Sequence, residues 1–401
     1  MQNKKHPYRT FLTVLFIVMS TLLLVCCGSA PAGPDSKHSG DDPSGDKEKL
    51  NIFFINVGKG DAALIGIPGG KWFLVDTGPK KGFAEVGRQL RLHKVDKLEA
   101  VFISHPHSDH VGNLDEILKL APCKQLYTTP ADYGKATQNM METANQNGMT
   151  VENLEPGAKI EIGGATMTAL GPNGTFPAEN DNSLVLMLEY EGSKVLFAAD
   201  QLFMGEEALL KRQIPLDCDV LKAGHHGESD ASSPQWLAAA KPEYCIVTNT
   251  AEDAESPLPG FIERFKAHGA TTYMLGETGT MLCEAEGGKV QFFAVKPPDG
   301  QQMPAFKITE LDTKDEHITI RNDSGQTVDL DGWSILPEKG NDLYFFPGGT
   351  MLEPGKTLTV YSGKENPPPS GLLWTAKKIW HDKKADAAVL IDPYGREADR
   401  R

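Results

Sequence analysis

Short runs of apolar residues, alternating with polar ones or unbroken, recur along most of the chain after residue 49. Leu50–Val57, Ala62–Ile67 and Lys71–Val75 carry this pattern and are separated by glycine-containing turns, which predicts strands joined by hairpins. Apolar residues three and four positions apart predict helices over Glu85–His93 and Asn113–Leu120. The first part of the folded chain is therefore expected to mix strands with helices.

The strand pattern continues further along the chain, where it alternates with helical segments. Strands are predicted over residues 98–103, 159–162, 165–170, 183–189, 194–198, 220–222, 244–248, 271–274, 280–285 and 289–294. Helices are predicted over residues 206–212, 234–240 and 260–268. Hairpin pairs together with strands separated by helices favour a sandwich of two mixed sheets with helices outside, an α+β fold.

The pattern changes after a linker at residues 297–304, which contains Pro297-Pro298-Asp299-Gly300. Short strands then follow one another without helices, over residues 307–311, 317–321, 327–330, 333–336, 343–346 and 357–361. Such spacing predicts a small all-β sandwich. We expect it to occupy residues 305–395, behind a first domain at residues 50–296.

The chain begins with a predicted export signal at residues 1–27. A basic start precedes an apolar run over residues 11–25, shorter than the roughly 20 residues of a membrane-spanning helix. The run ends in a sequence similar to a bacterial lipobox, which makes Cys27 the predicted lipidated residue; a plain cleaved signal and an uncleaved anchor are the alternatives. Residues 28–49, rich in Gly, Ser, Pro and charge, predict a flexible tether. The protein is expected to be exported and anchored by this lipid alone to the outer face of the bacterial cell membrane.

Composition and charge restrict the possible partners. The 401 residues are 40% hydrophobic and 23% charged, as in ordinary globular proteins of two or three domains. The net charge is −14, and most of it comes from residues 50–304, which carry 21 basic and 33 acidic side chains. An acidic surface does not attract nucleic acid by itself, so charge argues against a simple DNA-binding protein. Bound divalent cations would cancel part of this surplus.

Four cysteines follow the tether: Cys123, Cys218, Cys245 and Cys283. In an exported protein an even number permits disulfides. Their spacing matches no zinc-binding pattern, and each also suits a small buried apolar side chain. The sequence leaves these two interpretations open.

The strongest chemical signal is the segment Ser104–Gly112, which directly follows a predicted buried strand. This segment contains three histidines and an aspartate within six residues. In an extended segment His105 and His107 point the same way, so they can share one cation. Asp109 and His110 can turn toward a second one. Imidazole nitrogens with carboxylate oxygens suit zinc, manganese or iron. The alternative, a solvated histidine-rich loop, does not explain the spacing.

Further motifs accompany this H-x-H-x-D-H pattern in a defined order. They are Ile55–Ala62, Val75-Asp76-Thr77-Gly78, Asn182–Val185, Ala199-Asp200 and Leu221–Gly227. Together they resemble the metallo-β-lactamase superfamily, most of all the hydrolase domain of ComEC-type competence proteins, which is similar to that of phosphorylcholine esterases. The resemblance implies an αββα metallo-β-lactamase sandwich.

The resemblance also implies two divalent metal ions, Zn or Mn. His105 and His107 would bind the first ion. Asp109 and His110 would bind the second, and Asp200 would bridge the two. Many members of the superfamily have another histidine between the first cluster and the bridging aspartate, but this chain has none between His110 and Asp200.

One histidine of the pair His225 and His226 would complete the second site, and the other would face the substrate. Asn182 and Ser183 lie near the position of the missing histidine and are candidates to orient water or a phosphate oxygen; a strand cap is the alternative. With Asp109 and His226 they form the predicted catalytic set.

Asp76 and Asp61 are expected to support the ligands through hydrogen bonds. Asp76 follows a predicted strand and precedes Gly78, and Asp61 follows Gly60 and precedes a predicted strand. Side chains at such strand ends can hold the metal-binding loop by hydrogen bonds. We expect a structural role of this kind more than a catalytic one.

The last domain has a resemblance of its own. Phe306–Leu311, Ile318–Asn322, Val328–Trp333 and Leu352–Lys356 are similar to a lamin-tail domain, an immunoglobulin-like sandwich found beside secreted bacterial nucleases and ComEC-like hydrolases. The resemblance implies a module that binds nucleic acid or an envelope polymer. A structural spacer is the alternative.

We therefore predict an exported metal-dependent hydrolase, a phosphodiesterase or nuclease that cleaves extracellular DNA with a metal-activated water. A phosphorylcholine esterase acting on envelope polymers is the second hypothesis. A β-lactam or lactone hydrolase fits less well because the third histidine is missing, and the intact cluster argues against an adhesion protein with a decayed site. No protein partner is predicted.

Overall fold

The computed structural model describes residues 49–250, 259–339, 342–380 and 386–401. The predicted signal peptide at residues 1–27, its Cys27 and all but the last residue of the predicted tether lie outside the described residues. None of the helices described is both long and apolar enough to cross a bilayer.

The first sheet has eight strands in the order β15-β14-β1-β2-β3-β4-β5-β6. Their bounds are β1 Leu50–Phe54, β2 Ala62–Ile67, β3 Lys71–Thr77, β4 Ala100–Ile103, β5 Gln125–Thr128, β6 Thr150–Asn153, β14 Met281–Glu286 and β15 Lys289–Ala294. Strands β15 to β3 pair antiparallel, and β3 to β6 pair parallel. This is the mixed sheet that the hairpin pattern predicts.

The second sheet has seven strands in the order β13-β12-β11-β10-β9-β8-β7. Their bounds are β7 Lys159–Ile162, β8 Ala165–Gly171, β9 Val185–Tyr190, β10 Ser193–Phe197, β11 Val220–Lys222, β12 Tyr244–Val247 and β13 Thr271–Met274. The order places β10 and β11, whose carboxyl ends lead to Asp200 and His226, next to each other and parallel.

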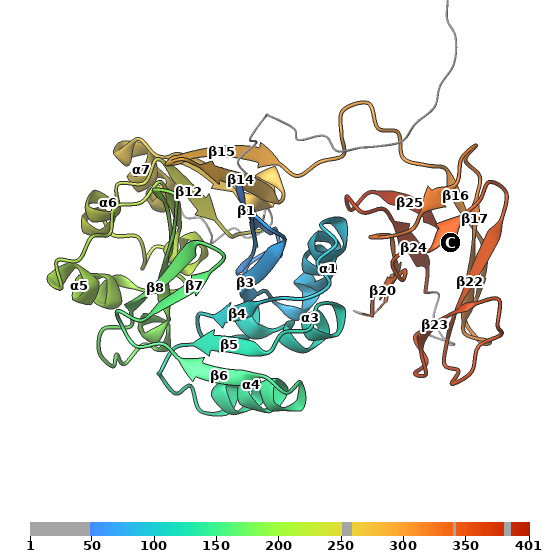
Figure 1. The fold of residues 1–401 in the computed structure, drawn as a ribbon, viewed down its shortest axis with the longest axis horizontal. Helices are drawn as coiled ribbons and strands as arrows, with labels where there is room; N and C mark the ends of the chain where they lie inside the picture. The colour runs from blue at the N-terminus through green and yellow to red at the C-terminus, as the bar shows by residue number, and fades with distance from the viewer. Residues whose placement is uncertain (1–48, 251–258, 340–341, 381–385) are drawn as a thin grey trace, which may run out of the picture. The chain divides into compact units, whose positions relative to one another are not determined.

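The two sheets pack face to face with helices outside, so the predicted αββα sandwich is confirmed (Figure 1). Phe54, Phe102 and Phe197 are among the large side chains buried between the sheets. Helices α1 (Phe83–Leu92), α3 (Leu114–Leu120) and α4 (Lys135–Gln146) cover the first sheet. Helices α5 (Phe203–Lys211), α6 (Pro234–Ala240) and α7 (Pro259–His268) cover the second, with Trp236 fully buried. A short helix α8 (Leu275–Thr278) follows β13.

Residues 121–158 hold three elements for which the sequence pattern gave no prediction: β5, α4 and β6. The two strands have only four residues each. Helix α4 is mostly polar, and Met140 and Ala144 are its only buried residues. These elements are short or mostly polar, so they give sequence-based prediction few apolar positions to use.

Two predicted boundaries differ near the site. Strand β1 ends at Phe54 rather than Val57, because the chain turns there and the Val57 amide donates to the Ile55 carbonyl at 3.0 Å. The histidine motif is extended only up to His107, and Ser108–Val111 forms the single-turn helix α2. Because of this turn, Asp109 and His110 point in a different direction from His105 and His107.

The C-terminal domain consists of two four-stranded sheets and a short strand pair, with no helix among its described residues. The sheets are β16-β17-β22-β23 and β20-β19-β24-β25, and β18 pairs with β21. Their bounds are β16 Phe306–Asp312, β17 His317–Asn322, β18 Val328–Asp329, β19 Ser334–Pro337, β20 Tyr344–Phe345, β21 Met351–Leu352, β22 Thr357–Ser362, β23 Leu372–Thr375, β24 Ala388–Ile391 and β25 Glu397–Arg400. Trp333 is buried in its core against Phe306, 4.7 Å between ring centroids. The predicted immunoglobulin-like sandwich is confirmed, and its last strand lies beyond the expected end at residue 395.

The four cysteines of the folded chain are buried free thiols. Cys245 and Cys283 are fully enclosed in the apolar cores. They pack as small apolar side chains, one of the two interpretations that the sequence left open.

Candidate metal centre

The histidine motif, Asp200 and His226 meet at one edge of the sandwich, although they are far apart in sequence. Strand β4 ends next to His105, β10 ends before Asp200, and β11 ends before His226. The chain bends sharply there: Ala199, His225 and His226 have φ values of 50°, 46° and 54°. Non-glycine residues rarely adopt this left-handed conformation, and such strain concentrates at functional sites.

His105 and His107 face each other across the position predicted for the first metal ion. His105 Nε2 and His107 Nδ1 lie 2.9 Å apart. Asp200 Oδ2 lies 3.8 Å from His105 Nε2. His105 is fully buried, whereas the His107 side chain is 30% exposed. The first group of nitrogens therefore opens toward the surface on the His107 side.

A second group of ligand atoms also surrounds Asp200. His110 Nε2 lies 3.1 Å from Asp200 Oδ2, and His226 Nε2 lies 3.3 Å from Asp200 Oδ1. Asp109 Oδ2 is 3.3 Å from His226 Nε2 and 4.0 Å from His110 Nε2. Oδ2 of Asp200 thus faces both groups and Oδ1 faces His226, so Asp200 is placed to contribute to both.

The structure separates the roles of the adjacent histidines. His226 points inward, as just described, and is buried. His225 points elsewhere: its Nδ1 lies 2.8 Å from Asp230 Oδ1, and its Nε2 lies 3.1 Å from Asn180 Nδ2. Its side chain is 23% exposed. Of the two alternatives left open by the sequence, the geometry favours His226 as the ligand and leaves His225 beside the centre.

Each of the four clustered imidazoles turns its other nitrogen to a protein acceptor. The outer pairs are His105 Nδ1 with Ser104 Oγ at 3.1 Å, His107 Nε2 with Glu179 Oε2 at 3.0 Å, His110 Nδ1 with Asp76 Oδ2 at 2.9 Å and His226 Nδ1 with Asp61 Oδ1 at 3.1 Å. A carboxylate accepts the N–H of a ring and so fixes its tautomer and orientation, which is the usual arrangement around metal-bound histidines. In a neutral ring held this way, the inner nitrogen would present its lone pair to a metal ion.

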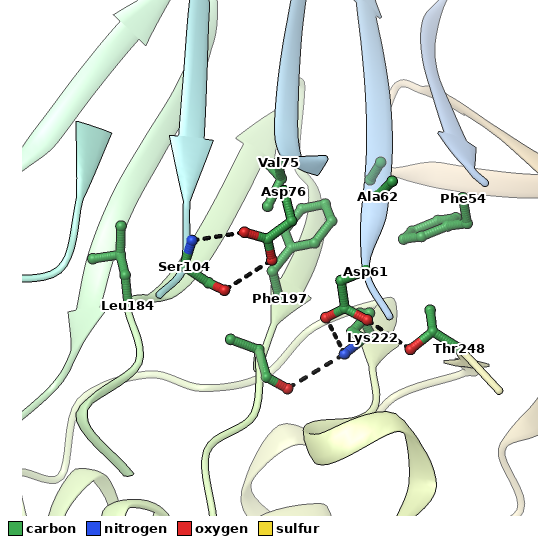
Figure 2. A pocket seen from close by; sticks show the side chains of 12 residues that line it. Phe54, Asp61, Ala62, Val75, Asp76, Ser104, Leu184, Phe197, Lys222 and Thr248 are labelled. Atoms are coloured by element: carbon green, nitrogen blue, oxygen red, sulfur yellow. Dashed lines mark hydrogen bonds and ion pairs between the residues drawn. The ribbon is translucent and has the colours of Figure 1, made fainter. Parts of the chain in front are cut away.

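Asp76 has the supporting contacts that the sequence predicts. Besides the His110 ring it accepts the Ser104 amide at 2.7 Å and the Ser104 hydroxyl at 2.8 Å (Figure 2). Burial raises the pKa of Asp76 even though the charge of His110 opposes this. Asp76 therefore holds the start of the histidine loop and one of its rings.

Asp61 is tied to a lysine that the sequence analysis did not single out. Its carboxylate pairs with Lys222 Nζ and accepts the Thr248 hydroxyl at 2.6 Å (Figure 2). Burial alone would raise the pKa of Asp61, but the charges of Lys222 and His226 outweigh it and hold that pKa below its usual value. Asp61 lies within ligand distance of the His110–Asp200–His226 group. Because Lys222 already neutralises it, we assign it to support of His226 rather than to metal binding.

The charges of the centre shift several pKa values. Burial would lower the pKa of His110 and of His226, but the surrounding carboxylates outweigh it. They raise the pKa of His226 to about 10 and that of His110 well above its usual value. The pKa of Asp200 is correspondingly lowered, since burial is outweighed by His110 and His226. In His105, burial and the nearby His110 charge lower the pKa.

The residues fit a pair of divalent cations. Within the described part of the chain, His110 Nε2 and Asp200 Oδ1 are buried atoms whose only near polar neighbours are other candidate ligands, and these contacts lack hydrogen-bond geometry. Buried polar atoms normally have partners, so exceptions call for an explanation such as a bound ion. Imidazole nitrogens and carboxylate oxygens are the donor set of zinc, manganese and iron sites.

The candidate residues Asn182 and Ser183 use their side chains inside their own loop. The Asn182 amide bonds the backbone of Phe176 at 2.9 and 3.0 Å and of Ala178 at 3.0 Å. The Ser183 hydroxyl donates to the Asn180 carbonyl at 2.7 Å. These contacts match the alternative of a local cap, and a catalytic role for the two residues stays a prediction.

Sequence reasoning missed three residues that contact the centre: Lys222, Glu179 and Tyr133. Lys222 carries a signal, a charged residue at the end of an otherwise apolar strand. Glu179 lies three residues before Asn182 and has no distinguishing pattern. Tyr133 lies on an unpredicted loop, with its ring 5.4 Å from that of His107 and 5.7 Å from that of His105. Only the fold brings the last two to the histidines.

The family comparison agrees with this geometry. The profile described as "Metallo-beta-lactamase superfamily" matches residues 55–247, from the Ile55 motif to the end of β12. The chain carries a metallo-β-lactamase domain. The profile described as "Lamin Tail Domain" matches residues 301–401, so a lamin-tail domain follows the metallo-β-lactamase domain. Both predicted resemblances are thereby confirmed.

Curated relatives of this chain include competence proteins. The chain is 22% identical over 267 residues to ComE operon protein 3 of Bacillus subtilis, covering 62% of this chain and 34% of that protein. It is 28% identical over 201 residues to competence protein ComA of Neisseria gonorrhoeae, covering 49% of this chain and 27% of that protein. The matched part thus spans about a quarter to a third of these relatives' length.

Solved structures of the same fold are more distant in sequence. The metallo-β-lactamase fold protein YhfI from Bacillus subtilis is 14% identical with a TM-score of 0.44, covering 61% of this chain and all of that chain. Zn²⁺-bound PqqB from Methylobacterium extorquens is 14% identical with a TM-score of 0.39, covering 53% of this chain and 85% of that chain.

Proposed function

We propose that this metallo-β-lactamase-fold hydrolase is a phosphodiesterase, acting as a nuclease on extracellular DNA. One observation carries the proposal: Asp200 lies between two groups of ligand atoms, so that two cations would sit next to each other. Paired divalent cations suit phosphodiester hydrolysis because they clamp the attacking and leaving oxygens. The competence-protein relatives support the choice of DNA among phosphodiesters.

The mechanism assigns separate tasks to the residues of the centre. Two bound cations would supply an activated water and offset the negative charge of the phosphodiester. Asp200 and His226 hold inner positions, while Asp61 and Asp76 orient the imidazoles behind them. His225 lies at the exposed side, where Asp230 contacts its Nδ1 and Asn180 its Nε2, so it would meet a substrate phosphate by exchanging the Asn180 contact.

A phosphorylcholine esterase is the second candidate. Residues 50–304 carry 21 basic and 33 acidic side chains, and this surplus favours a substrate with a cationic group such as choline over polyanionic DNA. A β-lactam or lactone hydrolase has less support, because no histidine lies between His110 and Asp200.

The proposal places this activity outside the cell. It includes a lipid on Cys27 as the membrane anchor, and a lamin-tail domain that binds nucleic acid or an envelope polymer. The basic start and apolar run of residues 1–27 support export. The lamin-tail domain carries 13 basic and 16 acidic side chains over residues 305–401, so its binding would depend on local contacts more than on net charge.

The test is hydrolysis of plasmid and single-stranded DNA by a protein that starts near Leu50 and keeps both domains. Reactions contain Mn²⁺, Zn²⁺ or chelator, with the variants His107→Ala and Asp200→Ala. His268→Ala, at an exposed position on α7, is the matched control. Metal-dependent cleavage that both variants lose, and the control keeps, is expected. Intact DNA with turnover of nitrophenyl-phosphorylcholine would favour the second candidate, and opening only a lactam or lactone would refute both.

A further inference from the structure

The group of ligand atoms around His105 and His107 is poorer than the one around His110 and His226. It contains two imidazoles and shares Asp200 with the second group. The sequence offers no third histidine for it between His110 and Asp200. The second group contains two imidazoles and Asp109 besides Asp200. The first ion is therefore expected to depend more on how strongly its two imidazoles bind.

The binding strength of an imidazole depends on the acceptor of its other nitrogen. In the second group both rings donate to buried carboxylates, Asp76 and Asp61. In the first group His105 faces only the neutral hydroxyl of Ser104. Among the described residues, Glu179 is the one carboxylate in contact with the outer nitrogen of a first-group imidazole, at 3.0 Å from His107 Nε2. A carboxylate on the outer nitrogen makes the inner nitrogen a stronger ligand.

The position of Glu179 is set by its backbone rather than by packing of its side chain. It begins the 3-10 helix η2 (Glu179–Asn182), and its carbonyl accepts the Tyr133 hydroxyl at 3.0 Å. The Tyr133 ring in turn contacts His107 edge-on, at an interplanar angle of 86°. The carboxylate itself is 64% exposed. Replacing it should therefore leave the fold intact while changing the electrostatics at His107.

We propose that Glu179 is a positioning residue that sets the occupancy of the first metal site. Its carboxylate accepts the His107 Nε2–H, which fixes the tautomer and leaves the Nδ1 lone pair on the side of His105 Nε2. Glu179 stands on the outer nitrogen, so it acts through His107 and does not itself bind the metal. This inference rests on the two-cation site of the proposed function, and it does not depend on which substrate is cleaved.

The experiment measures metal binding rather than activity. Metal-free protein is titrated with Mn²⁺ by calorimetry and equilibrium dialysis, and bound metal is counted by elemental analysis. Two equivalents are expected for the wild type. Glu179→Gln should weaken one of them by about 10-fold or more, the lower end of the range for partners of metal-bound histidines, and should leave the other unchanged. Glu142→Gln, an exposed glutamate on α4, is the matched control.

A spectroscopic measurement identifies which ion is lost. Two neighbouring Mn²⁺ ions give a coupled EPR signal, and at intermediate Mn²⁺ Glu179→Gln should show isolated Mn²⁺ where the wild type shows the pair. The inference would be overturned if Glu179→Gln bound Mn²⁺ at both sites with the same affinities as the wild type. It would also be overturned if the wild type bound a single equivalent. If the wild type binds two ions but cleaves no phosphodiester, the proposed function fails while the inference on Glu179 stands.

Discussion

Lys222 and Asp61 form a buried ion pair directly behind the inward-facing His226. Lys222 is 3% exposed and Asp61 is 6% exposed. The other oxygen of Asp61 accepts from His226 Nδ1, and Lys222 Nζ also donates to the Ala199 carbonyl at 3.3 Å, next to Asp200. One lysine thus connects the supports of two metal-centre residues from the side away from the metals.

The ion pair should be energetically coupled. Asp61→Asn leaves Lys222 buried without its counter-charge, which should cost about 3–5 kcal/mol of unfolding free energy. Lys222→Met should cost less, because Asp61 keeps the positively charged His226 as a neighbour. The double variant should be more stable than the sum of the single losses predicts, by about 1–3 kcal/mol. Urea unfolding of the metal-free wild type, the two single variants and the double variant measures these free energies. Strictly additive losses would contradict a direct coupling.

The two adjacent histidines should differ in metal content. His226→Ala removes an inner nitrogen 3.3 Å from both Asp200 and Asp109, so the protein should retain about one metal equivalent less after dialysis. His225→Ala removes a ring held by Asp230 and Asn180, and it should keep the metal content of the wild type. Elemental analysis of both variants decides the assignment. Loss of metal in His225→Ala alone would reverse the roles.

The sequence predicted the fold and most of the centre because both rest on local patterns. Alternating apolar runs located β2, β7, β11, β13 and β15 at their observed bounds. The H-x-H-x-D-H spacing places four ligand groups within six residues, and the structure brings His105 and His110 to Asp200, with His107 beside His105 and Asp109 beside His110. Local patterns of this kind can be recognised in the sequence without knowledge of the tertiary structure.

The remainder of the centre depends on contacts between distant segments. Glu179 reaches His107 across 72 positions, and Lys222 reaches Asp61 across 161. Neither pairing leaves a local pattern in the sequence. The choice between His225 and His226 depends on two successive left-handed residues, a conformation that side-chain type does not predict. Asn182 was singled out by position alone, and its side chain is used within its own loop.

Metal binding should release protons near neutral pH. Without metal, the surrounding carboxylates raise the pKa of His226 to about 10 and that of His110 well above its usual value, so both rings are protonated at pH 7. A metal ligand must be neutral, so cations displace these protons and apparent affinity should rise from pH 6 to 9. Calorimetry with Mn²⁺ in buffers of different ionisation enthalpy counts the protons. Buffer-independent heats would contradict the prediction.

The same shift predicts how pH affects the metal-free fold. The folded-state pKa of His226 lies above the value of about 6.5 expected for an unfolded chain. Its contribution to stability is therefore complete below about pH 6.5 and is lost as pH rises through about 10. Metal-free protein should lose melting temperature across this range more steeply than His226→Asn does. A parallel decline in both proteins would mean that other groups control the effect.

Asn113 fastens the loop that follows Asp76. Its side-chain amide donates to the carbonyls of Thr77 at 2.9 Å, Gly78 at 3.3 Å and Pro79 at 2.6 Å, and the residue is 1% exposed. Asn113→Ala leaves these buried carbonyls without a donor, which should cost about 1–3 kcal/mol of unfolding free energy.

The loss should extend to the metal centre, because the same loop holds His110. The Thr77 hydroxyl donates to the His110 carbonyl at 2.9 Å, and Asp76 holds the His110 ring. Asn113→Ala should therefore weaken Mn²⁺ binding as well as lower the urea midpoint. Asn139→Ala, at an exposed position on α4, should change neither. A variant that unfolds more easily but binds Mn²⁺ with wild-type affinity would show that the loop is stabilised by Asn113 without being needed to position His110.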